Sequence, residues 1–332
     1  MNASPTPSDM HARAIVARWV PQLVAAGIGT ARLDAELLVA HVLGIARERI
    51  LIDDPQLSAA QLQETDDLLR KRAEERVPVA YLVGQRWFAD LSLNVSPSVL
   101  VPRPETELLV DLAAEHAPAG ARLRDVGTGS GAIALALAKR RPDLTIVASD
   151  IDGAALDVAR ENARRHGVLD DTDEEHGNTQ GADAGDAGRA KARDQHVGAA
   201  DAQGTEAADG GGQWPPPGRI VFEHAPLLGP SWAGDVVVSN PPYVESTLRG
   251  RLAPELDHEP AHALYAGEDG LDVIRDLIDA CRSRTVGLVL IEHGATQGTA
   301  VREMLAAAGY PTAATEQDLA GLDRVTWARH GT

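Results

Sequence analysis

The stretch LRDVGTGSGAIALALAKR, from Leu123 to Arg140, constrains the fold more than any other part of the chain. Its pattern predicts a strand over 123–126, a glycine turn over 127–131 and a helix over 132–140. Glycines permit a strained turn and let a ligand approach the backbone. The helix amino terminus then receives the negative end of that ligand. The unit therefore predicts a parallel α/β sheet with a ligand site at the carboxyl ends of its strands.

The spacing of the glycines narrows the kind of ligand. The turn has the pattern G-x-G-x-G and consists of Gly127, Thr128, Gly129, Ser130 and Gly131. It lacks the third glycine position of the dinucleotide pattern G-x-G-x-x-G, and Asp125 lies just before it. We interpret this as an S-adenosyl-methionine site in which Asp125 and the turn hold the amino-acid end. A dinucleotide enzyme is the alternative, because such enzymes also use a glycine-rich turn.

A carboxylate closes the second predicted strand. The stretch LTIVASD ends at Asp150, about twenty residues after the glycine turn, where a carboxylate can accept the two hydroxyls of a ribose. S-adenosyl-methionine and NAD both carry such a ribose. The alternative role for Asp150 is to cap the next helix, GAALDVARENARRHG, although Asp152 is also placed to do so. The two roles of Asp150 are compatible.

A later apolar run, Asp235 to Ser239, leads directly into Asn240, Pro241, Pro242 and Tyr243. The run is short and β-branched, which is typical of a buried parallel strand that ends at the same sheet edge. The prolines stiffen the turn and leave carbonyl acceptors, the Asn240 side chain adds another acceptor, and Tyr243 offers a flat face for stacking. Such a turn suits a planar NH2 group whose nitrogen must be oriented. The alternative is a structural Pro-Pro turn whose Asn caps the strand.

Helical periodicity dominates the amino-terminal part of the chain. Apolar residues recur at spacings of three and four in the stretches 11–27, 31–45 and 58–75. Ser58 followed by Gln61 resembles a capping box. We expect a small helical domain here.

The domain boundaries follow from changes in pattern. Alternation over 87–95 predicts a short hairpin. We expect a helical substrate-recognition domain over 1–82, a hairpin linker over 83–103 and an α/β domain over 104–332. Within the last, residues 168–217 are rich in Gly, Ala, Asp and Glu, and we predict that they form a disordered acidic insert.

Two further segments carry candidate polar contacts. Arg103 lies between two prolines, before a helix predicted to begin near Glu105. It is either a substrate or cofactor contact or a solvated cap. Beyond the Asn-Pro-Pro-Tyr turn, a loop carries Glu259-Pro260 and Gly267 before a helix predicted from Leu271.

Composition excludes several classes of protein. The net charge of −18 argues against broad binding of a phosphate backbone, so no direct nucleic-acid partner is expected. The single cysteine, Cys281, excludes an internal disulfide and suits a core position, and neither it nor the scattered histidines have metal-ligand spacing. Without a long apolar segment or a leader pattern, we expect a cytoplasmic protein with no membrane partner.

Taken together, GTGSGAIALALA, the strand ending at Asp150, NPPY, VPRPETE and EPAHALYAGEDGL resemble the release factor glutamine methyltransferases, the PrmC/HemK family. The resemblance covers nearly everything outside the insert. It implies a Rossmann-like class I S-adenosyl-methionine-dependent methyltransferase: a seven-stranded, mostly parallel sheet with an antiparallel final strand, preceded by the small helical domain.

The resemblance also implies a reaction and its residues. The enzyme would transfer a methyl group from S-adenosyl-methionine to the side-chain amide nitrogen, N5, of the glutamine in the Gly-Gly-Gln motif of peptide chain release factors. We expect a monomer, although no sequence pattern determines the oligomeric state. Asn240 and Pro241 would hold that amide beside Pro242 and Tyr243, and Asn240 would also contact the cofactor. Arg103 and Glu259 would contact the substrate. The alternative is an N6-adenine or N2-guanine nucleic-acid methyltransferase, which shares the NPPY turn.

Two features depart from the family pattern. Where relatives carry an acidic and then an aromatic residue near the adenine, this chain has His224 and Ala225. The insert contains Gly211-Gly212-Gln213, the tripeptide that the family modifies. We treat this tripeptide as a coincidence of a glycine-rich stretch, with a pseudosubstrate role as the alternative hypothesis.

Overall fold

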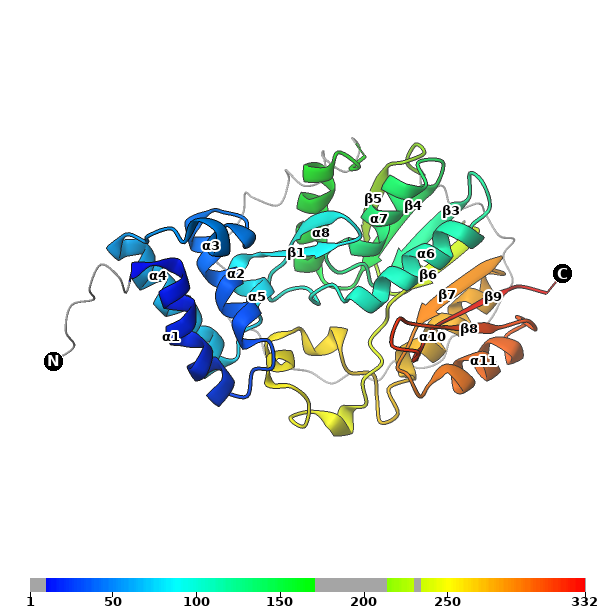
Figure 1. Ribbon diagram of the computed structural model, residues 1–332. Helices are drawn as coiled ribbons and strands as arrows, with labels where there is room; N and C mark the ends of the chain where they lie inside the picture. The colour runs from blue at the N-terminus through cyan, green and yellow to red at the C-terminus, as the bar shows by residue number, and fades with distance from the viewer. Residues whose placement is uncertain (1–9, 171–213, 230–233, 332) are drawn as a thin grey trace, which may run out of the picture. The chain divides into compact units, whose positions relative to one another are not determined.

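The computed structural model describes residues 10–170, 214–229 and 234–331 (Figure 1). The chain divides into two compact units, which are described separately. The helical unit comprises Met1–Glu107 and Pro241–Ile274, and the sheet unit comprises Leu108–Asn240 and Arg275–Thr332.

Helices form the first part of the helical unit. Their bounds are α1 Ala12–Ala25, α2 Ala31–Leu43, α3 Glu48–Asp53, α4 Ala59–Arg70 and α5 Val79–Val83. The three predicted helices are confirmed as α1, α2 and α4, and the predicted capping box is present: the Ser58 side chain accepts from the Gln61 backbone while Gln61 accepts from Ser58. Ile15, Leu23 and Leu38 are fully buried in the shared core. The short helices α3 and α5 were not predicted.

Three further elements complete the helical unit. A π-helical turn, Lys71–Glu75, continues α4. The predicted hairpin is confirmed as β1 Gln85–Phe88 paired antiparallel with β2 Leu91–Asn94. The segment 241–274 contains short 3-10 turns, and Val244 forms an isolated parallel bridge with Tyr265.

A seven-stranded sheet forms the centre of the sheet unit, in the order β5-β4-β3-β6-β7-β9-β8. Strands β3 to β7 run parallel to one another, while β9 is antiparallel to both β7 and β8. This is the predicted mostly parallel sheet with an antiparallel final strand. The strand bounds are β3 Arg122–Val126, β4 Thr145–Asp150, β5 Ile220–His224, β6 Val236–Ser239, β7 Leu288–Glu292, β8 Ala314–Gln317 and β9 Asp323–Arg329.

Helices accompany this sheet. Their bounds are α6 Glu107–His116, α7 Ala132–Arg140, α8 Gly153–His166, α10 Asp272–Ser283 and α11 Gly298–Ala307. Helices α7 and α8 pack on β4 and β5, and α11 packs on β8 and β9. Every residue of β4 and β6 is buried, as expected for parallel strands covered on both faces. Cys281 of α10 is a buried free cysteine, as predicted.

The edges of the predicted insert are structured. Val168 and Leu169 are buried, and the backbone N–H of Ile220 donates to the Val168 carbonyl at 2.9 Å. The chain therefore continues along β5 before it enters the insert. The predicted Gly211-Gly212-Gln213 tripeptide lies outside the described residues.

In the part of the chain that the structure describes, no helix has the length and apolar character needed to cross a membrane. Over the same residues, no three His, Cys, Asp or Glu side chains gather in a way that could hold a metal ion.

Candidate active site

The two predicted site segments follow neighbouring strands of the sheet unit. Strands β3 and β6 are parallel, and Val126 at the end of β3 pairs with Ser239 at the end of β6. The Ser239 hydroxyl donates to the Val126 carbonyl at 2.7 Å. Gly127 and Asn240 are the next residues of the two strands, so the glycine turn and Asn240 leave the sheet at adjoining positions on its carboxyl edge.

Asp125 is fully buried near the end of β3, below the glycine turn. Its Oδ2 accepts from the Thr128 hydroxyl at 2.7 Å and from the Ala134 backbone N–H at 3.2 Å. The second bond satisfies one of the donors that the first turn of α7 leaves without an intrahelical partner. Within the described residues, Oδ1 of Asp125 has no hydrogen-bond partner. One buried acceptor therefore remains for a ligand, which fits the ammonium group of an amino acid.

Burial raises the pKa of Asp125 to about 7, against the hydrogen bonds from Thr128 and Ala134. The nearby Asp150 carboxylate also acts to raise it. A cation bound at this carboxylate would reverse the shift, because an opposite charge favours the ionised form. Asp125 is therefore poised to couple its ionisation to the binding of a cationic ligand.

The five turn residues have different environments. Gly127 is exposed and Gly129 half-buried, while Thr128, Ser130 and Gly131 are buried. A Cβ at Gly127 or Gly129 would meet nothing within 4 Å, and both glycines have positive φ, +70° and +55°. The open side of the turn is thus lined by backbone, which leaves room for a ligand to approach closely.

Gly131 differs from Gly127 and Gly129, because its lack of a side chain allows α7 to pack closely on α8. It has a φ of +82°, and a Cβ there would lie 2.7 Å from Leu135 Cδ1 and 3.3 Å from Ala159 Cβ. Gly131→Ala should lower the free energy of unfolding by about 2 to 4 kcal/mol, because a left-handed alanine and an overpacked core both destabilise. Gly129→Ala, which faces open space, should lower it by only about 1 to 2 kcal/mol. Urea unfolding of both variants checks this order, and equal losses would contradict it.

Asp150, at the end of β4, ties the turn to its neighbouring strand. Its Oδ2 accepts from the Gly129 N–H at 2.9 Å, and its Oδ1 accepts from the Asp152 N–H at 3.0 Å. A carboxylate accepts about four hydrogen bonds, so two acceptor positions remain for ribose hydroxyls. The cap of α8 is Asp152, whose side chain accepts from the Ala154 N–H at 2.8 Å. Of the two alternatives for the cap, Asp152 is therefore confirmed.

His224 is the last residue of strand β5 and pairs in register with Asp150. Its Nε2 is 2.8 Å from the Ile151 carbonyl, so this nitrogen carries the hydrogen. The buried Ala225 donates its N–H to the Asp150 carbonyl at 3.0 Å. The residue that departs from the family pattern is thus at the same sheet edge as Asp150.

The two predicted substrate contacts lie in the helical unit and bind each other. Arg103 Nη2 is 2.6 Å from Glu259 Oε1, and Glu259 Oε2 accepts from the Val101 N–H at 3.2 Å. The Glu259 side chain is 2% exposed and that of Arg103 is 31% exposed. Next to this pair, burial raises the pKa of Tyr81, and the Glu259 charge raises it further. The Tyr81 hydroxyl donates to the Val99 carbonyl at 2.6 Å.

The remaining predicted site residues follow β6. Asn240 is half-buried and is the last residue of its stretch in the sheet unit. Pro241 is buried, Pro242 and Tyr243 are half-buried, and these three open the second segment of the helical unit. The bond from Asn240 to Pro241 is thus the point at which the chain passes from one unit to the other.

The sheet order, the glycine turn and the carboxylate at the end of β4 define the class I methyltransferase fold, whose members use S-adenosyl-methionine as methyl donor. Residues 14–84 match the family described as PrmC N-terminal domain, and residues 104–182 match the family described as methyltransferase small domain.

Relatives identify the family within this class. The release factor glutamine methyltransferase of Gloeobacter violaceus is 36% identical over 89% of this chain and 91% of its own length. The protein of the same name from Escherichia coli K12 is 34% identical over 90% of this chain and 92% of its own length. The chain belongs to the release factor glutamine methyltransferase family.

One solved structure also resembles the chain, a release-factor-specific protein-(glutamine-N5) methyltransferase from Alicyclobacillus acidocaldarius. It is 22% identical, with a TM-score of 0.34 over 72% of this chain and 100% of that one.

Proposed function

We propose that this enzyme methylates the side-chain amide nitrogen of the glutamine in the Gly-Gly-Gln motif of peptide chain release factors. The observation that carries the proposal is the position of Asn240 at the carboxyl end of β6, in register with the glycine turn after β3. Membership of the family supports the substrate, since the two relatives above are named for it. Because those names specify a protein substrate, the nucleic-acid alternative is not retained.

The sheet unit would hold the cofactor. Oδ1 of Asp125 is the open acceptor for the ammonium group, the backbone of Gly127 and Gly129 lines the amino-acid end, and Asp150 accepts from the ribose. Thr128 would support the site indirectly, because its hydroxyl donates to Asp125 and so helps to hold that carboxylate in place. Ser130 and Gly131 are buried parts of the turn that preserve its shape. When bound, S-adenosyl-methionine supplies a methyl group activated by a sulfonium.

The turn would hold the substrate amide. The Asn240 side-chain oxygen and the Pro241 carbonyl accept its two hydrogens, and Pro242 keeps the turn rigid. Tyr243 packs on the planar group. The amide nitrogen is then oriented for attack, and this positioning is the main catalytic contribution. No side chain removes a proton before attack, and the proton leaves the nitrogen afterwards.

Arg103 and Glu259 would divide the predicted substrate role between them. A carboxylate with 2% of its side chain exposed cannot meet a macromolecule directly, whereas Arg103 is 31% exposed and presents part of its guanidinium. We infer that Glu259 orients Arg103 and that Arg103 contacts the release factor. We further propose that the enzyme acts in the cytoplasm, where translation terminates, and that it acts as a monomer, because one chain supplies all the proposed residues.

Fragmentation mass spectrometry tests the proposal. A purified release factor is incubated with enzyme and S-adenosyl-methionine, and the Gly-Gly-Gln peptide is sequenced. The expected result is one added methyl on the glutamine side chain, and none when that glutamine is replaced by alanine. Methyl at another residue, or none on the intact factor, would refute the proposed reaction.

A further inference from the structure

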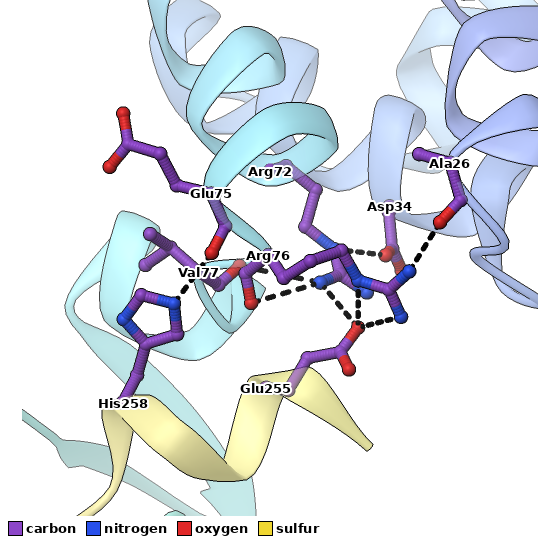
Figure 2. A network of polar contacts seen from close by, with 8 residues as sticks. All are labelled: Ala26, Asp34, Arg72, Glu75, Arg76, Val77, Glu255 and His258. Carbon is purple, nitrogen blue, oxygen red and sulfur yellow. Dashed lines mark hydrogen bonds and ion pairs between the residues drawn. The ribbon is translucent and has the colours of Figure 1, made fainter. Parts of the chain in front are cut away.

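One carboxylate joins the segment that follows the Asn-Pro-Pro-Tyr turn to the helices of the same unit (Figure 2). Glu255 belongs to the short 3-10 turn Pro254–His258. Its Oε1 is 2.7 Å from Arg72 Nη1, and it also accepts from Arg76 Nη2 at 2.7 Å and Nε at 3.0 Å. Hydrogen bonds from Arg72 and Arg76 hold the pKa of Glu255 below its usual value, against the effect of burial.

Both arginines are anchored on their other sides. Arg72 donates from Nε to Asp34 Oδ2 at 2.7 Å, and the side chains of this pair are each 7% exposed. Arg76 donates to the Ala26 carbonyl. Figure 2 shows Arg72 and Arg76 both reaching Glu255, while Asp34 of α2 accepts from Arg72 and the Ala26 carbonyl, just after α1, accepts from Arg76. Through these two arginines, the Glu255 carboxylate is connected to α2, to the chain after α1 and to the π-helical turn.

The backbone at this point is shaped to aim the two guanidinium groups. Arg72 lies in the π-helical turn Lys71–Glu75, and Arg76 follows it with a φ of +61°. A left-handed conformation is unfavourable for a non-glycine residue, so it persists only where other contacts determine it. A buried ion pair is in itself weak evidence for stability, because desolvation offsets the attraction. We therefore attribute to the Glu255 ion pairs the role of fixing the position of the segment 241–274, and not mainly a contribution to the free energy of unfolding.

The same segment is held at a second point four residues later. Glu259 binds Arg103 and the Val101 N–H, as described above. Between the two carboxylates, His258 Nε2 lies 2.7 Å from the Glu75 carbonyl. The segment begins at Pro241, which the proposed function places against the substrate amide. Glu255 and Glu259 therefore hold the same segment, 241–274, that contains Pro241 and Tyr243 of the proposed amide-binding turn.

We propose that Glu255 is a positioning residue for methyl transfer. Through Arg72 and Arg76 it fixes the segment 241–274 on the helical unit, so that a release factor held by this unit meets Pro241 and Tyr243 in a set position. The inference rests on the proposed function and adds to it the residue that links substrate recognition to the reactive turn.

Glu255→Gln tests the inference, because it removes the charge and keeps the size of the side chain. The matched control is Asp257→Asn, which removes the same charge from an exposed side chain two residues away. Glu255→Asp is the conservative variant. For each we would measure kcat and KM with a release factor, the Kd of S-adenosyl-methionine and the melting temperature, with active sites counted by cofactor titration.

The expected result is a fall in kcat of about tenfold or more for Glu255→Gln, since small displacements of a reacting group lower rates by up to about 10²-fold. Glu255→Asp should recover part of that rate, and Asp257→Asn should match the wild type. The cofactor Kd should stay unchanged in all three, because the proposed cofactor residues lie in the sheet unit. An unchanged kcat per active site, or an equal loss in Asp257→Asn, would overturn the inference. Failure of the wild type to methylate the factor would instead refute the proposed function.

Discussion

Asn240→Ala should lower the rate of methyl transfer to the release factor by about 10²- to 10³-fold, the range seen when one well-placed hydrogen-bonding group is removed from an active site. The variant loses the side-chain acceptor of the proposed amide site, so the amide nitrogen is no longer held in one orientation. The fold should persist, because Asn240 is only half-buried and the buried residues of β6 before it are unchanged.

Single-turnover rates at saturating cofactor measure this effect without a contribution from product release. Asn240→Asp is the informative companion, because it keeps an acceptor at the same position. It should retain more activity than Asn240→Ala. Melting temperatures near that of the wild type would confirm that both variants fold. A rate for Asn240→Ala close to that of the wild type would show that the turn is structural, which is the alternative that the sequence left open.

Asp125→Asn should weaken S-adenosyl-methionine binding by about 30-fold or more, because a buried, charge-assisted contact contributes about 2 to 5 kcal/mol to binding. The asparagine oxygen still accepts from Thr128, so the glycine turn keeps its support. Asp125→Ala removes that acceptor as well. It should therefore also lower the free energy of unfolding by about 1 to 3 kcal/mol, the cost of leaving a buried donor unsatisfied. Calorimetric titration and urea unfolding separate the two effects.

The pH dependence of binding gives a sharper test of Asp125. Its pKa is raised to about 7 in the free protein, and a cationic ligand favours the ionised carboxylate. Below pH 7 a proton must leave before binding, so the affinity should fall by up to about tenfold per pH unit as the pH decreases, and should level off above pH 7. Asp125→Asn should abolish this slope. A wild-type affinity that does not change between pH 5 and pH 7, an interval set by that raised pKa, would contradict the assignment.

The raised pKa of Asp125 also makes the free energy of unfolding depend on pH, in the direction opposite to that of cofactor affinity. The unfolded carboxyl group has a pKa near 3.8, and the folded one has a pKa of about 7. Between these values the folded state binds more protons, so the stability of the free protein falls as the pH rises through this interval. Stability and cofactor affinity are therefore expected to change in opposite directions with pH.

Local signals explain why much of the sheet unit could be predicted. Helix α7 has the predicted bounds 132–140, because glycines before it and a continuous helical pattern within it mark both ends. Strand β6 lies within the predicted run 235–239, since a short β-branched run between polar residues has few other structures open to it. The predicted edge of the sheet, with Asp125, Asp150 and Asn240 at strand ends, follows from parallel order alone.

The contacts that could not be predicted join residues far apart in the chain. Arg103 and Glu259 are separated by 156 positions, and Arg72 and Glu255 by 183. No periodicity or turn signal connects such pairs, and either arginine alone is indistinguishable from a solvated side chain. The different roles of Gly129 and Gly131 could not be predicted either. They depend on the tertiary structure, since Gly129 faces open space and Gly131 faces the packed side chains of α7 and α8.

Transfer of a labelled methyl group tests the central claim most directly. The wild-type enzyme would receive, in parallel, an intact release factor, the same factor with its Gly-Gly-Gln glutamine replaced by alanine, and a structured RNA. The proposed function predicts label in the intact factor alone. Label in the RNA, or equal label in the alanine variant, would contradict it.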